Sequence, residues 1–132
     1  MPTQTQVAPV SKKMLWTGWI MTILPVLLLL MSGVMKLVRP DFVIAGFNHL
    51  GLPEHLTLPL GILELSCTII YLNPRTAVLG AILLTGYLGG AILTHLRVGE
   101  AVFAQAGFGV LLWGGLFLRD PRLRVLIPLR QK

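Results

Sequence analysis

Glu64 has the clearest chemical potential of any residue in this sequence, because it stands alone in the middle of an apolar segment. That segment spans residues 56–72. Glu64 lies eight residues from either end of it, about 12 Å at the rise of an α-helix. An ionisable side chain at that depth is costly and normally faces the inside of a helix bundle. Two roles fit such a carboxylate: it handles a proton or a polar ligand, or it forms a fixed ion pair that joins two helices.

The neighbours of Glu64 follow a helical repeat and divide into two faces. The small and polar face holds Thr57, Gly61, Glu64, Thr68 and Tyr71. The opposite face holds Leu58, Ile62, Leu65, Ile69 and Leu72. Because spacings of three and four residues place side chains on one side of a helix, the polar face is predicted to point inward.

Five further polar residues are candidates for binding a ligand or handling a proton together with Glu64. They are Lys36, Tyr87, His95, Arg97 and Gln105. If successive apolar segments cross the membrane in opposite directions, four of these residues lie at the same level in the outer half of the bundle, and Glu64 lies below that level. The exception is Tyr87. Such convergence from distant parts of the chain predicts a pocket. The depth of Glu64 argues against a direct pair with Lys36 unless the helices tilt.

The sequence predicts neither a catalytic residue nor a metal site. Ser32 and Ser66 lack a base at a readable spacing. The three histidines lack the i, i+4 pair that holds zinc on one face of a helix. Cys67 is the single cysteine, which excludes an internal disulfide and a two-cysteine redox motif. We therefore expect no autonomous enzymatic activity, and no cofactor is evident.

Membrane-spanning helices must position these side chains. The chain of 132 residues is 55% apolar and carries 11 basic and 5 acidic residues, a smaller charged share than in soluble domains. Four apolar runs lie at about residues 15–37, 56–72, 76–96 and 101–118. Each can cross a hydrocarbon core of about 30 Å, the second and fourth only just.

The fold class predicted from these runs is all-α, an integral membrane four-helix antiparallel bundle. Its single domain covers residues 14–120, between a flexible tail at 1–13 and a basic tail at 121–132. The first run is read as a retained helix, since it is longer than the apolar core of a signal peptide. Residues 40–51 predict a short interfacial helix between the first two runs, with Pro40 and Asp41 at its start and Gly51 at its end.

Basic residues sort by side of the membrane, which argues against nucleic acid as a partner. Eight of the eleven fall on the side of both termini: Lys12, Lys13, Arg75, Arg119, Arg122, Arg124, Arg130 and Lys132. The positive-inside rule then places both termini in the cytoplasm, and the membrane is predicted to be a bacterial-type inner membrane. The basic tail is expected to touch anionic headgroups.

Glycines are predicted to bring neighbouring helices close together. Gly86 and Gly90 form a small-xxx-small pair, Gly89 extends the same thin surface, and Gly61 lies on the polar face described above. The helix at 76–96 is therefore expected to press against a neighbouring helix. The alternative is a groove that admits a flat ligand beside Tyr87.

With these residues assembled, the chain resembles the DoxX-like family. The likeness rests on SGVMKL at 32–37, FNHLGLP at 47–53, LGILEL at 60–65, LNPRT at 72–76 and GYLGGAILTHLRVG at 86–99. It implies a four-helix membrane bundle with cytoplasmic termini. It also implies roles like those of relatives in membrane redox complexes, including a subunit type of thiosulfate:quinone oxidoreductase.

The function predicted from residues and resemblance together is an accessory or quinone-interacting subunit of a membrane redox system. Quinone is accordingly the ligand class expected at Glu64 and its companions. A structural or assembly subunit that packs against a partner membrane protein is one alternative, and a small transporter is another. The lipid bilayer is the expected environment; a homo-oligomer and a separate membrane-protein partner both stay open.

Overall fold

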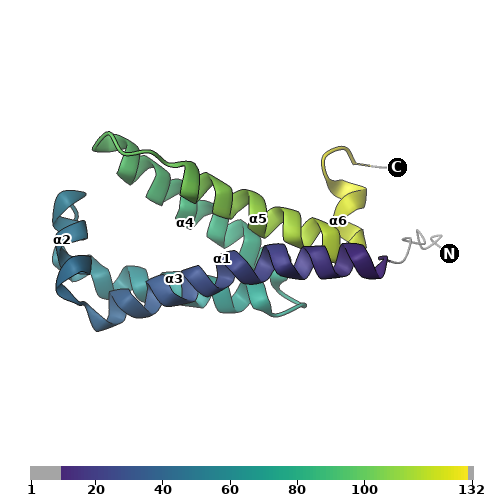
Figure 1. The fold of residues 1–132 in the computed structure, drawn as a ribbon, viewed down its shortest axis with the longest axis horizontal. Helices are drawn as coiled ribbons and strands as arrows, with labels where there is room; N and C mark the ends of the chain where they lie inside the picture. Colours follow the sequence, from purple (N-terminus) through teal and green to yellow (C-terminus); the bar gives the residue numbers. More distant parts are fainter. Residues whose placement is uncertain (1–9, 131–132) are drawn as a thin grey trace.

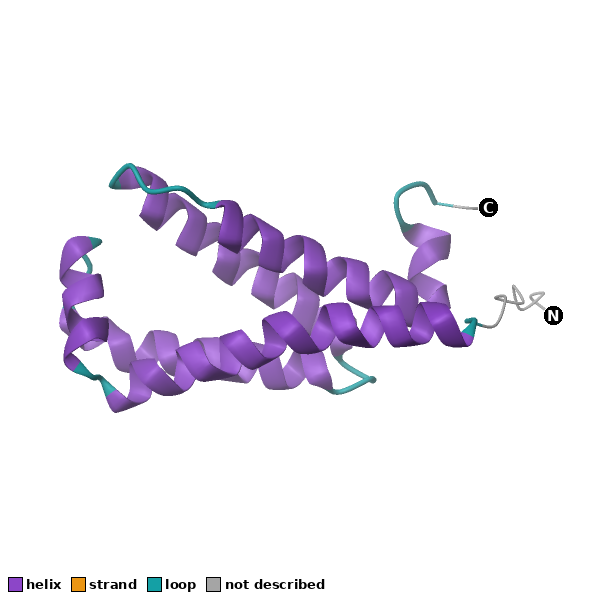
Figure 2. Ribbon diagram, in the orientation of Figure 1, coloured by secondary structure: helices purple, strands orange, loops and turns teal. Residues whose placement is uncertain are grey.

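The computed structural model describes residues 10–130, and the regular structure in this range is entirely helical (Figure 2). In chain order the elements are α1 (Lys12–Val38), α2 (Asp41–His49), the short 3-10 helix η1 (Glu54–Leu56), α3 (Thr57–Leu72), α4 (Ala77–Arg97), α5 (Phe103–Arg119) and α6 (Pro121–Leu126). The all-α prediction is confirmed. The parts of the expected tails at residues 1–9 and 131–132 lie outside the described range.

Four long helices make up the body of the molecule. α1 lies against α3 and α5, and α4 lies against the same two helices. The helices come together at the end where both termini lie, and the pair α1 and α3 diverges from the pair α4 and α5 towards α2 (Figure 1). We call these two ends of the molecule the termini end and the α2 end.

Three of the long helical segments are long and apolar enough to cross a membrane. They are Lys12–Val38, Glu54–Leu72 and Ala77–Arg97. α5 begins two residues later than expected and has only 17 residues. Of the four predicted membrane-spanning helices, three therefore have the length and composition of a span. At 1.5 Å per residue, α5 is about 25 Å long, shorter than a hydrocarbon core of about 30 Å.

Short helices occupy both ends of the bundle. The helix predicted at 40–51 is α2, which stands across the diverging ends of the long helices (Figure 1). Phe47 of α2 is buried. After α2 the chain turns at Gly51, whose φ of +74° is a conformation that favours glycine. α6 falls in the segment expected as a tail, where Asp120 caps it and Leu123 packs into the core.

Glycines mark the points where the long helices approach most closely. A Cβ on Gly61 would lie 2.9 Å from the Cβ of Lys36 and 3.0 Å from the carbonyl oxygen of Gly33, so α1 and α3 meet backbone to backbone. Gly18 and Gly115 allow the same approach between α1 and α5, since a Cβ on either glycine would meet the other's carbonyl oxygen at 2.8 Å. These contacts hold the polar residues of three helices at fixed levels.

Gly86, Gly89 and Gly90 do not contact another helix of the described chain, so the neighbour predicted for them stays a prediction. No atom of the described chain lies within 4 Å of the position that a Cβ would take at any of the three. All three are exposed on α4. The neighbouring helices meet α4 on another face, where Gly80 sits against the backbone of Tyr71. Close packing of α4 inside the chain therefore depends on Gly80.

Candidate functional site

Glu64 is buried in the interior, with 2% of its surface exposed. The polar face predicted around it is confirmed, because Thr57, Gly61, Thr68 and Tyr71 are buried with it on α3. Most of the opposite face is exposed, including Ile62 and Ile69. Burial of a carboxylate in an apolar interior requires compensating partners, which come from two neighbouring helices.

The first partner is Lys36 on α1, whose Nζ lies 2.7 Å from Oε2 of Glu64. This corrects the expectation that depth separates the two residues. Gly61 faces the Cβ of Lys36 and lies three residues, about 4.5 Å, before Glu64 along α3. The lysine stem spans that offset, so Lys36 reaches into the bundle. A lysine at the membrane boundary would usually extend towards water instead.

Two hydroxyl groups complete the network. Tyr87 on α4 donates a hydrogen bond to Oε2 of Glu64 at 3.0 Å, and Ser32 on α1 donates to the same oxygen at 3.4 Å. Lys36 also donates to the hydroxyl of Ser32 at 2.7 Å. The sequence shows no base at a readable spacing from Ser32, and its position one turn before Lys36 on α1 places it in the network. We call these four residues the Glu64 network.

The Glu64 network retains unused hydrogen-bonding capacity. An ammonium group has three protons, and Lys36 donates two of them to Glu64 and Ser32. Its side chain is 17% exposed, whereas that of Glu64 is 2% exposed. All of the hydrogen bonds to the carboxylate end on Oε2, and Oε1 accepts none from the described residues. Of the two charged members of the network, Lys36 is therefore the one that a ligand can reach more directly.

His95 and Arg97 belong to a separate polar group at the α2 end. Nδ1 of His95 donates to the carbonyl oxygen of Ala91 at 2.7 Å, and Arg97 donates to the carbonyl of Leu50, at the end of α2. Glu100, in the turn after α4, lies 2.6 Å from His49 of α2. These contacts fasten α2 to the turn between α4 and α5 and do not reach the Glu64 network.

Gln105 joins neither group. It lies in the first turn of α5, and its Oε1 is buried without a hydrogen-bond partner among the described residues. The predicted convergence is thus partial: Lys36 and Tyr87 meet Glu64, while His95, Arg97 and Gln105 do not.

In a comparison with known protein families, residues 20–115 match the model of the DoxX-like family. The chain belongs to the DoxX-like family. Comparison with curated proteins gives no match, and comparison with solved structures gives none either. The matched range of this DoxX-like chain includes the whole Glu64 network and ends before Arg119.

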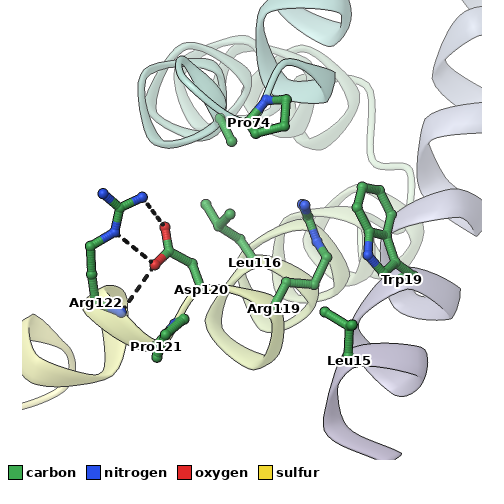
Figure 3. Close-up of a pocket in the computed structure, with 9 residues that line it drawn as sticks. Leu15, Trp19, Pro74, Leu116, Arg119, Asp120, Pro121 and Arg122 are labelled. Atoms are coloured by element: carbon green, nitrogen blue, oxygen red, sulfur yellow. Dashed lines mark hydrogen bonds and ion pairs between the residues drawn. The ribbon is translucent and has the colours of Figure 1, made fainter. Parts of the chain in front are cut away.

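A second polar cluster of this DoxX-like protein was missed by sequence reasoning. Arg119, the last residue of α5, donates to the hydroxyl of Thr22 at 3.1 Å and to that of Tyr71 at 3.3 Å. Its guanidinium carbon lies 4.3 Å from the centre of the Trp19 ring (Figure 3). One signal was available: Tyr71 shares the inward face of α3 with Glu64, so its hydroxyl needed a partner.

Proposed function

We propose that this protein is a quinone-interacting accessory subunit of a membrane redox system, with the Glu64 network as its ligand-binding centre. The observation that carries the proposal is the ion pair of the partly buried Lys36 and the buried Glu64, joined by the Tyr87 hydroxyl from a third helix. Ionisable groups within membrane helices usually mark pathways for ligands, ions or protons. Membership of the DoxX-like family supports the membrane setting of this role.

Hydrogen-bond chemistry makes a quinone a suitable ligand. A quinone carbonyl oxygen only accepts hydrogen bonds, and Lys36 has one proton free to donate. The corresponding quinol donates through its hydroxyl groups, and Oε1 of Glu64 is an acceptor that receives no hydrogen bond from the described residues. An apolar quinone tail would enter from lipid, which the exposed apolar side chains of the long helices face.

Orientation in the membrane is part of the proposal. Among the described residues, seven basic side chains lie at the termini end: Lys12, Lys13, Arg75, Arg119, Arg122, Arg124 and Arg130. Asp120 is the one acidic residue at that end, since the other four acids lie in α3 or at the α2 end. The positive-inside rule then supports cytoplasmic termini in a bacterial-type inner membrane.

Glu64→Gln is expected to weaken quinone binding about tenfold or more, because a hydrogen bond to a charged group contributes about 1.5–3 kcal/mol. The glutamine keeps the size of the side chain but removes the charge that positions Lys36. Binding of a short-chain benzoquinone and a short-chain naphthoquinone to the purified protein would be measured by equilibrium titration. Ser66→Ala is the matched control, because Ser66 is exposed on the same helix.

Two results would contradict this role. One is unchanged quinone affinity in a folded Glu64→Gln protein. The other is an equal loss of affinity in Ser66→Ala, which would show that binding depends on general features of α3 and not on the Glu64 network.

The exposed glycines of α4 support a second candidate, a structural or assembly subunit. Gly86, Gly89 and Gly90 leave a thin surface that no helix of the described chain occupies. In membranes, such a surface allows the backbone of another helix to approach closely. The occupant would be a partner membrane protein or a second copy of this chain.

Gly86→Leu is expected to abolish co-purification of a stoichiometric partner from native membranes, because its side chain would fill the thin surface. Gly46→Leu is the matched control: Gly46 also has open space around its Cβ position, but it lies on α2. Mass spectrometry of the gently purified complex would give the composition. Retention of the same partner by the Gly86→Leu protein would rule out this surface as the assembly site.

A further inference from the structure

The termini end contains an open hollow that the Glu64 network does not explain. Its volume is ≈ 290 Å³, and its walls come from α1, the turn between α3 and α4, α5 and the start of α6 (Figure 3). Leu15, Pro74 and Leu116 supply apolar walls, and Arg119 and Arg122 supply charge. This volume is at the lower limit of the range for pockets that enclose drug-sized ligands, about 300 Å³. It therefore suits a headgroup-sized moiety.

Arg119 carries a charge that no acid of the described chain neutralises. Its two hydrogen bonds go to the neutral hydroxyls of Thr22 and Tyr71. Those hydroxyls give their own protons to backbone carbonyls, Thr22 to Gly18 at 2.8 Å and Tyr71 to Leu112 at 2.6 Å. Their lone pairs are thus held towards Arg119. The guanidinium is fixed in place, while its Nη1 makes no hydrogen bond to the described residues.

Asp120 does not compensate Arg119, although it also lines the hollow. Its Oδ1 accepts from the backbone and side chain of Arg122 at 3.0 and 3.2 Å, and its Oδ2 accepts from the same guanidinium at 3.4 Å (Figure 3). The charges of Asp120 and Arg122 cancel each other. One net positive charge, that of Arg119, is left at the hollow.

The hollow lies where the apolar segments end. Leu15 and Trp19 are in the first two turns of α1, and Arg119 is the last residue of α5. This level of a membrane protein meets the phosphates and glycerol groups of lipids, and tryptophan is enriched there. A ligand at this place would meet a fixed cation and apolar walls that open to the bilayer.

We propose that this hollow binds the phosphate of an anionic phospholipid. The phosphate contacts Nη1 of Arg119, where a charge-assisted hydrogen bond forms, and the glycerol and upper acyl chains lie along Leu15 and Leu116. Arginine suits this role because its planar fork matches phosphate oxygens. The site is distinct from general attraction of the basic tail to the membrane surface, because it depends on one oriented guanidinium.

Native mass spectrometry of the purified full chain in detergent tests the proposal. The probe is short-chain phosphatidylglycerol, and the comparison ligands are phosphatidylcholine of the same chain length, glycerol phosphate and inorganic phosphate. One saturable phosphatidylglycerol per chain is expected, with affinity about tenfold or more above that of phosphatidylcholine. Arg119→Gln is expected to lose that advantage, whereas Arg130→Gln, an equal loss of charge outside the hollow, changes affinity by less than about twofold.

Leu15→Trp is the second variant, because it fills the hollow without removing a charge or a partner of Arg119. It is expected to reduce phosphatidylglycerol binding as strongly as Arg119→Gln, so the test does not depend on the folding of the arginine variant. The proposal is overturned if Leu15→Trp binds normally, if Arg130→Gln loses as much affinity as Arg119→Gln, or if both phospholipids bind equally. Binding of inorganic or glycerol phosphate as tightly as the phospholipid would overturn the lipid assignment in favour of a free phosphate.

Discussion

Lys36→Met is expected to lower the free energy of unfolding by about 3 kcal/mol, because it leaves the Glu64 carboxylate buried without its cation. This value is at the lower end of the range for breaking a buried pair, since the lysine side chain keeps 17% of its surface exposed. Methionine retains most of the stem that packs against Gly61, so the loss reports mainly the charge. Unfolding by dodecyl sulfate in mixed micelles, followed by circular dichroism, would measure it.

Two further variants separate the pair from general effects of the substitution. Lys13→Met removes an exposed lysine from the other end of α1 and is expected to change stability by less than about 0.5 kcal/mol. The double variant Lys36→Met, Glu64→Met removes both charges and is expected to recover much of the loss, as replacement of buried ion pairs by apolar residues often does. If Lys36→Met is no less stable than Lys13→Met, the pair does not hold α1 to α3.

Sequence reasoning located Glu64 and its inward face because a helical repeat is a local property. The position of Thr57, Gly61, Thr68 and Tyr71 on that face follows from spacing alone, and all four are buried. The pairing with Lys36 could not be predicted in the same way. It depends on how closely α1 approaches α3, and that distance is set by Gly33 and Gly61 acting together from two helices.

Other parts of the site depended on lateral contacts that the order of the chain does not specify. Boundary residues such as His95 and Arg97 lie near one end, as predicted. Their contacts beyond α4 are with Glu100, in the turn after α4, for His95 and with Leu50, at the end of α2, for Arg97. From the sequence, Arg119 is predicted only to be one of several cytoplasmic charges. Its contact with Trp19 arises because α5 lies against α1, and its contact with Tyr71 brings in α3 as well. No motif in the sequence records either contact.

Glycine patterns illustrate the same limit. The spacing of Gly86 and Gly90 is a known signal for helix association, but the spacing does not say which helix responds to it. Inside the chain, close approach uses glycines on facing helices, such as Gly18 with Gly115. Gly86 and Gly90 of α4 are instead free to contact a neighbouring molecule or lipid.

Gly80→Ala is expected to lower the free energy of unfolding by about 3 kcal/mol, the upper part of the range for overpacking. Its added Cβ would meet the backbone of Tyr71, and backbone atoms cannot move aside as a flexible side chain can. The displaced Tyr71 also carries the hydroxyl that binds Arg119 and the carbonyl of Leu112. The substitution on α4 should therefore also weaken contacts that α1 and α5 make with Tyr71.

Gly86→Ala is the matched control, because it makes the same substitution on the same helix where no atom of the described chain lies within 4 Å. Both variants gain the same helix propensity, about 1 kcal/mol on scales measured in water, so their difference isolates the contact with Tyr71. In the monomer, Gly86→Ala should be as stable as the parent or slightly more so. Equal stability of the two variants would mean that α3 and α4 are not held together at Gly80. It would also contradict the expectation that a change at Gly80 disturbs the contact between Tyr71 and Arg119.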